Sequence, residues 1–132
     1  ADGSCSLVPL DLLDKDDWYG VTYTGGTREQ EPSAAPSLIR LGMLQWAHDE
    51  GIHTWISCEP VLNAEKVLGL ISGGSAYLAH SKFKIGKLNY WPSDINWHDF
   101  GHEAERLCKL HGRNYYIKDS LRREMEDANE NL

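Results

Sequence analysis

Cysteine is scarce in this chain, since its 132 residues include only three cysteines, which lie far apart in the sequence. No two of Cys5, Cys58 and Cys108 have the C-x-x-C spacing of a metal site. Their odd number also argues against the paired disulfides that hold small secreted domains together. We therefore expect a reducing compartment, the cytoplasm, in which these thiols stay free.

Long apolar runs are missing as well. No stretch approaches the roughly 20 consecutive apolar residues that a membrane-spanning helix requires. The first residues, ADGSCS, have neither the charged segment nor the apolar core of a secretory signal. We therefore expect no membrane association and no targeting segment. Because the chain starts at Ala1 and not at Met, we also expect a trimmed or cut amino terminus.

Basic residues are in the minority, with 13 Lys and Arg against 20 Asp and Glu and a formal net charge of −7. A chain with this balance repels a phosphate backbone, so nucleic-acid binding by the chain alone is disfavoured. The 41% hydrophobic and 25% charged residues are typical of a globular protein, and the length suits one domain with a core.

Predicted strands and helices alternate along the chain. Short runs of apolar, hydroxyl and aromatic residues predict strands at 19–24, 55–59, 82–87 and 114–118. Helices are predicted at 37–50, 64–71 and 96–111, and from Ser120 onward. Asn63 can cap the second of these helices, and Asp94 or Asn96 can cap the third.

A leader precedes this alternation and an acidic tail follows it. Residues 1–17 are predicted to carry a short helix at 7–13, residues 18–125 to form the single domain, and residues 126–132 to fray. The helix at 37–50 has apolar residues almost all the way round, so we expect it to be buried on more than one side.

The strand starts recur about every thirty residues, which is the pattern of repeated βα units. Right-handed crossovers would make the strands parallel, with helices on one side of the sheet. The predicted fold class is therefore α/β, a partial (half) TIM-like βα barrel of about four parallel strands. A closed eight-stranded barrel is excluded, because it typically needs about 250 residues.

Polar side chains are predicted to gather on the concave face of this sheet, away from the helices. Alternation along the strands sends seven residues there: Thr22, Thr24, Ser57, Glu59, Lys82, Lys84 and Lys118. So polar a surface predicts a wet cleft, in which Glu59 pairs with one of the lysines. A second interpretation is that Glu59 and Lys84 form a purely structural ion pair.

Several blocks of sequence resemble a known family: YGVTYTG, GIHTWISCEPVL, FKIGKLNYWPSDINW and NYYIKDSL. Together they resemble the carboxyl-terminal half of the radical S-adenosylmethionine domain, in the branch related to spore photoproduct lyase. Members of that family build a partial βα barrel, and an early C-x-x-x-C-x-x-C loop binds a 4Fe–4S cluster that cleaves the cofactor to a radical. This chain lacks the cysteine motif, so no catalytic residue and no bound cofactor are expected in it alone.

The resemblance also implies two groups of site residues. Thr24, Ser57 and Glu59 would lie on the cofactor side, and Lys84, Lys87 and Asn89 on the substrate side. The chain would then be a carboxyl-terminal portion of such a protein, inactive alone, whose partner is the missing amino-terminal half.

Three further interpretations stay open. The chain could be a non-catalytic binding or assembly domain that forms a homo-oligomer, because an open sheet exposes its edges. It could also be an enzyme that needs no cluster and uses Glu59 and Lys84 as acid and base. His98 and His102 have a spacing that can bind zinc, although surface histidines are the simpler interpretation.

Overall fold

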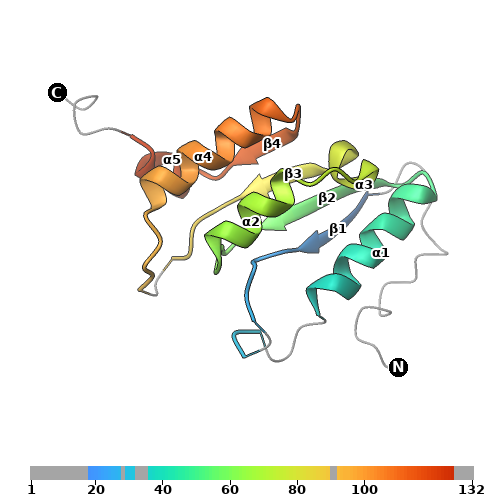
Figure 1. Ribbon diagram of the computed structural model, residues 1–132, viewed down its shortest axis with the longest axis horizontal. Helices are drawn as coiled ribbons and strands as arrows, with labels where there is room; N and C mark the ends of the chain where they lie inside the picture. Colours follow the sequence, from blue (N-terminus) through green and yellow to red (C-terminus); the bar gives the residue numbers. More distant parts are fainter. Residues whose placement is uncertain (1–17, 28, 32–35, 90–91, 127–132) are drawn as a thin grey trace.

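A computed structural model of the chain describes residues 18–27, 29–31, 36–89 and 92–126. The described residues form the strands β1 (Trp18–Thr22), β2 (His53–Cys58), β3 (Lys82–Ile85) and β4 (Asn114–Ile117). The helices are α1 (Ser37–Asp49), α2 (Ala64–Ile71), α3 (Ala76–His80), α4 (Trp97–Leu110) and α5 (Asp119–Glu124), as Figure 1 shows. The predictions for the leader at 1–17 and for the tail after Glu126 lie outside the described residues.

The four strands form one sheet with the order β1-β2-β3-β4, and all neighbouring strands are parallel. The prediction of an α/β fold with a parallel sheet is therefore confirmed. The register aligns Gly20, Val21 and Thr22 of β1 with rows that cross all four strands, such as the row of Thr22, Ser57, Lys84 and Tyr116. The sequence order of the strands means that each βα unit lies beside the previous one.

The helices cover one face of this sheet, and Figure 1 shows α1, α2 and α3 in front of the strands. Alternate strand residues point under the helices and are buried, including Val21, Ile56, Phe83 and Ile117. The helices contribute the other half of this core with Leu44, Val67, Leu78, Ala104 and Leu121. Burial of such side chains stabilises a fold by about 1.5–3 kcal/mol each, so this single interface supplies the core of the domain.

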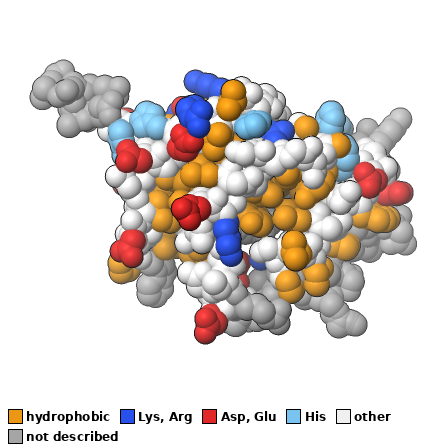
Figure 2. Space-filling view, in the orientation of Figure 1, with side chains coloured by type: hydrophobic (Ala, Val, Ile, Leu, Met, Phe, Trp, Pro, Cys, Tyr) orange, Lys and Arg blue, Asp and Glu red, His pale blue; other side chains and the backbone are white. Residues whose placement is uncertain are grey.

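Helix α1 departs from the prediction that it would be buried on more than one side. Only Leu44 and Ala47 of this helix are buried, while Leu38, Ile39 and Trp46 are 84%, 45% and 41% exposed. The helix packs on β1 and β2 with one side, and none of the described residues covers the other. Figure 2 accordingly shows hydrophobic side chains at the surface in the region of α1 and α2.

The helix ends follow from local sequence signals. Asn63 caps α2 by accepting a hydrogen bond from the N–H of Lys66 (3.0 Å), and Asn96 caps α4 in the same way through Asp99 (3.1 Å). Gly51 lies one residue beyond the cap of α1 with a positive φ of 82°, a conformation that costs glycine little. The single turn and a half of α3 was not predicted, because AYLAH is too short to show a helical period.

Among the residues that the structure describes, no helix combines the length and the apolar composition of a bilayer span.

Candidate functional site

The face of the sheet opposite the helices carries the predicted polar surface. We call it the open face, and it consists of Trp18, Gly20, Thr22, His53, Trp55, Ser57, Glu59, Lys82, Lys84, Gly86, Asn114, Tyr116 and Lys118. These residues alternate with the buried ones along each strand. Trp18 and Tyr116 are 54% and 45% exposed, so this face of the sheet is accessible.

Glu59 and Lys118 form an ion pair at the carboxyl edge of the open face. Glu59 Oε1 lies 3.4 Å from Lys118 Nζ, and the two side chains are 29% and 43% exposed. The residues follow β2 and β4, and Gly86 follows β3 between them. The backbone holds these ends in line, because Gly86 N–H donates to Cys58 O (3.0 Å) and Lys118 N–H donates to Ile85 O (2.9 Å). The predicted pairing of Glu59 with a lysine is present, and the lysine is Lys118.

Gly86 makes this pair possible. A Cβ atom at this position would lie 2.8 Å from Cδ of Glu59, so the carboxylate passes over the strand where the side chain is missing. The sequence block KIGKLNY contains this glycine, but its role depends on the register of β2 against β3, which sequence alone does not give. The position of Gly86 at the end of a predicted strand was the available signal, because glycine in a strand often marks the close approach of a neighbouring group.

Lys84 points to a different part of the open face. Its Nζ lies 5.0 Å from the centre of the Trp55 ring, within the range of a cation–π interaction. The Trp55 ring in turn lies over Gly20, where an added Cβ would be 2.1 Å from Cε2 of the indole. Glu59 and Lys84 are therefore not brought together as an acid–base pair. Lys84 instead lines a small pocket of about 240 Å³ with Trp18, Trp55 and Lys82.

Thr24 lies beyond the end of β1, in a place that the following loop closes. It is 2% exposed, and its hydroxyl donates to Glu31 Oε2 (2.7 Å) and accepts from Gly26 N–H (3.0 Å). Arg40 reaches the same carboxylate at 3.5 Å and donates to the carbonyl of Thr22 (2.7 Å). The side chain of Thr24 therefore ties the loop to the strand, whereas Ser57 remains half-buried on the open face.

The other two predicted residues lie away from Glu59. Lys87 has the alternation of Phe83 and Ile85, which point to the helices, and its Nζ forms an ion pair with Glu124 of α5 (2.8 Å). It also lies 6.0 Å from the ring of Trp97 in α4. Asn89 is half-buried in the segment after β3. Of the six predicted site residues, Ser57, Glu59 and Lys84 thus share the open face.

The described cysteines do not fit the ligand set of an iron–sulfur cluster. Cys58 and Cys108 are fully buried on the helix side of the sheet. Burial raises the pKa of the Cys108 thiol to about 12 and raises the pKa of Cys58 as well, so both stay protonated. Cluster ligands must be thiolates, and neither residue reaches the open face.

The described residues offer the two histidines of α4 no third metal ligand. Their rings are 4.6 Å apart, but His102 Nε2 is used in a hydrogen bond to the carbonyl oxygen of Met125 (2.7 Å). Within the described ranges, no group of three or more His, Cys, Asp or Glu side chains could hold a metal ion.

Comparisons of the chain with protein-family models, with curated proteins and with solved structures found no match.

Proposed function

We propose that this chain is the carboxyl-terminal portion of a radical S-adenosylmethionine-type domain, a partial TIM-like barrel that is inactive alone. The sheet topology supports the fold part of this proposal. The strands follow one another in sequence order with α1, α2 and α3 on a single face. A doubly wound sheet would instead reverse its strand order and place helices on both faces.

The Glu59–Lys118 pair is the observation that carries the functional part. Ligands of parallel α/β proteins bind at the carboxyl ends of the strands, and this pair lies at that edge on the open face. A partly exposed carboxylate and ammonium side by side complement a zwitterionic amino acid, such as the methionine end of S-adenosylmethionine. Glu59 would bind its ammonium group and Lys118 its carboxylate.

The reactive group would come from outside the described residues. The two described cysteines do not fit an iron–sulfur cluster, so the described residues would supply binding and orientation, and the cluster would come from elsewhere. This division is what a carboxyl-terminal portion requires, because the family's cluster loop lies in the amino-terminal half.

Anaerobic reconstitution with iron and sulfide tests the proposal. The product of the complete reading frame should take up about four iron atoms, the content of one 4Fe–4S cluster, whereas this chain alone should take up none. A complete reading frame that encodes only this chain, or a longer product without bound iron, would contradict the proposal.

A self-associating binding domain is the second candidate, and α1 favours it. Leu38, Ile39 and Trp46 expose apolar surface on one helix, which soluble monomers usually limit. β1 and β4 are also the two edges of the sheet. Size-exclusion chromatography with light scattering should then show a dimer or larger species that Trp46→Glu dissociates. A monodisperse monomer at high concentration would exclude this candidate.

A further inference from the structure

A second pocket lies on the helix side of the sheet, between the amino-terminal part of α1 and the side of α2. Its volume is about 450 Å³, within the usual range of small-molecule sites. It is lined by Tyr23, Gly25, Gly26, Ser37, Leu38, Leu41, Lys66, Gly69 and Leu70. We call it the α1–α2 pocket, and it shares no residue with the open face.

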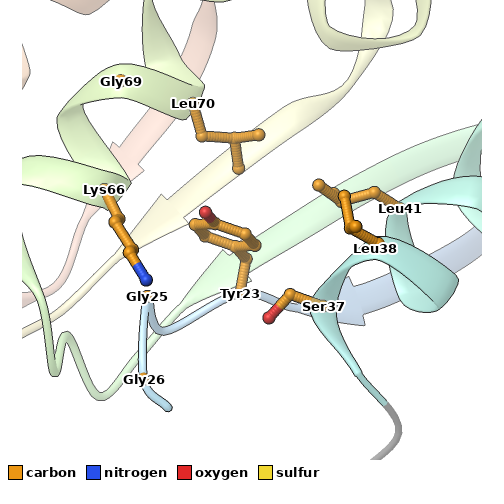
Figure 3. A pocket seen from close by; sticks show the side chains of 9 residues that line it. All are labelled: Tyr23, Gly25, Gly26, Ser37, Leu38, Leu41, Lys66, Gly69 and Leu70. Atoms are coloured by element: carbon orange, nitrogen blue, oxygen red, sulfur yellow. The ribbon is translucent and has the colours of Figure 1, made fainter.

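One part of the α1–α2 pocket is apolar. In Figure 3, the Tyr23 ring lies at the centre, with Leu38 and Leu41 of α1 on one side and Leu70 of α2 above it. Tyr23 and Leu70 pack against the core, and Leu38 is 84% exposed. An apolar ligand group in this place would cover side chains that now face water, which is favourable in proportion to the area buried.

The other part is polar and positively charged. Figure 3 shows the Lys66 side chain descending beside Gly25, and the Ser37 hydroxyl directed toward the same side of the pocket. Among the residues that the structure describes, no hydrogen bond or ion pair is assigned to Lys66 Nζ or to the Ser37 hydroxyl. An ammonium group and a hydroxyl beside an apolar wall are the arrangement of a site that orients a ligand.

The charges around the pocket favour a single negative charge on the ligand. Within the described part of the chain, no side chain caps the start of α1 and its first turn has no acidic residue, so the helix dipole there favours an anion. Glu31, next to Gly26, is already bound to Thr24 and Arg40. Lys66 is a single point charge and no arginine lines the pocket, so the site suits a carboxylate better than a dianionic phosphate.

We propose that the α1–α2 pocket binds a small monocarboxylate with an apolar body. The carboxylate contacts Lys66, the Ser37 hydroxyl and the start of α1, and the apolar body packs between Tyr23, Leu41 and Leu70. This site is independent of the proposed radical S-adenosylmethionine relationship, because none of its residues belongs to the open face.

Gly69 offers a way to block the pocket without disturbing the fold. It lines the pocket, and a Cβ atom added there would have no neighbour within 4 Å. Gly69→Leu also improves the helix propensity of α2. Gly42 of α1 is a matched control, since an added Cβ there is equally unobstructed and Gly42 does not line the pocket.

Calorimetric titration with 4-phenylbutyrate tests the proposal, with 4-phenylbutan-1-ol as the uncharged probe. The acid should bind saturably, and the alcohol about tenfold to a hundredfold more weakly, the range of one charge-assisted hydrogen bond. Lys66→Ala should weaken the acid by a similar factor and leave the alcohol unchanged. Gly69→Leu should abolish the binding of both the acid and the alcohol. Gly42→Leu and Lys109→Ala should leave the affinity for each probe unchanged.

Three outcomes would overturn the proposal. One is the lack of saturable binding of the acid at low-millimolar concentration. Another is equal binding of acid and alcohol, which indicates apolar adsorption only. The third is unchanged binding by Gly69→Leu after circular dichroism has verified its fold.

Discussion

The carboxylate of Glu59 occupies the space that a side chain at residue 86 would need. Cδ of Glu59 lies 2.8 Å from the position of a Cβ atom on Gly86. Glycine at the end of β3 therefore lets a carboxylate from the end of β2 reach Lys118 at the end of β4.

The first prediction is a non-additive pair of substitutions at these positions. Gly86→Ala should lower the free energy of unfolding by about 1 kcal/mol, because the Glu59 side chain must shift and its ion pair breaks. In a Glu59→Ala background the new methyl group meets no carboxylate, so the cost should vanish. Urea unfolding of the parent, the two single variants and the double variant measures the cost of Gly86→Ala in each background. An equal cost in both backgrounds would show that Glu59 and Gly86 are not coupled.

The second prediction concerns the contact of Trp55 with Gly20. A Cβ atom at Gly20 would lie 2.1 Å from the indole, so Gly20→Ala forces the ring and the strand apart. We expect the free energy of unfolding to fall by about 1–3 kcal/mol, the usual cost of overpacking.

Gly42→Ala is the control for the Gly20 substitution. Nothing lies within 4 Å of an added Cβ atom at this helical position, and alanine favours a helix over glycine by about 1 kcal/mol. The same chemical change should therefore stabilise the protein at Gly42. A loss of stability at Gly42 comparable to that at Gly20 would contradict this account.

The third prediction is a pH dependence that comes from Glu105. The hydrogen bonds from Arg122 (2.8 Å) and from the Tyr115 hydroxyl (2.8 Å) lower the pKa of this carboxyl to about 2, from its usual 4.5. The unfolded chain therefore takes up the proton first. The stabilisation is complete above about pH 4.5 and is lost as the pH falls toward 2.

Glu105→Gln measures this contribution. The variant should be less stable than the parent at neutral pH, and the difference should narrow below about pH 4.5. Glu103→Gln is a comparison, since its partner Arg106 lies on the exposed surface of the same helix and the pair contributes little. A stability difference for Glu105→Gln that stays constant down to acid pH would rule out this cause.

The fourth prediction concerns Arg113, which holds the carboxyl end of α2. Its guanidinium donates to the carbonyl of Ile71 (2.9 Å), which the helix end leaves free, and to the carbonyl of Gly73 in the turn that follows. Arg113→Ala should lower the free energy of unfolding by about 1–3 kcal/mol. Arg113→Lys should lower it by less, because its ammonium group can still donate hydrogen bonds but lacks the forked geometry of the guanidinium. Thermal unfolding of both variants checks this, and a neutral alanine variant would refute it.

The period-2 pattern predicted the faces of the strands well, since every residue of the sheet obeys the same alternation. It placed Ser57, Glu59 and Lys118 on the open face, where the structure has them. The partner of Glu59 was not predictable, because the choice between Lys84 and Lys118 depends on side-chain direction and on the space above Gly86. Lys87 also shares the alternation of Ile85, which places it toward the helices.

The exposure of apolar residues on α1 could not be predicted from the sequence, for a different reason. Its apolar residues show which side chains favour burial, but not whether another element is present to bury them. Leu38 and Trp46 are exposed because the helix lies at the edge of the sheet, beside β1. The unexpected α3 reflects a similar limit, because its few helical residues depend on the packing of Leu78.

The coding sequence immediately upstream of Ala1 tests the central proposal most directly. The open reading frame should continue upstream, encode further βα units and contain C-x-x-x-C-x-x-C. An intact upstream frame without these cysteines, or a start codon directly before Ala1, would contradict the proposal.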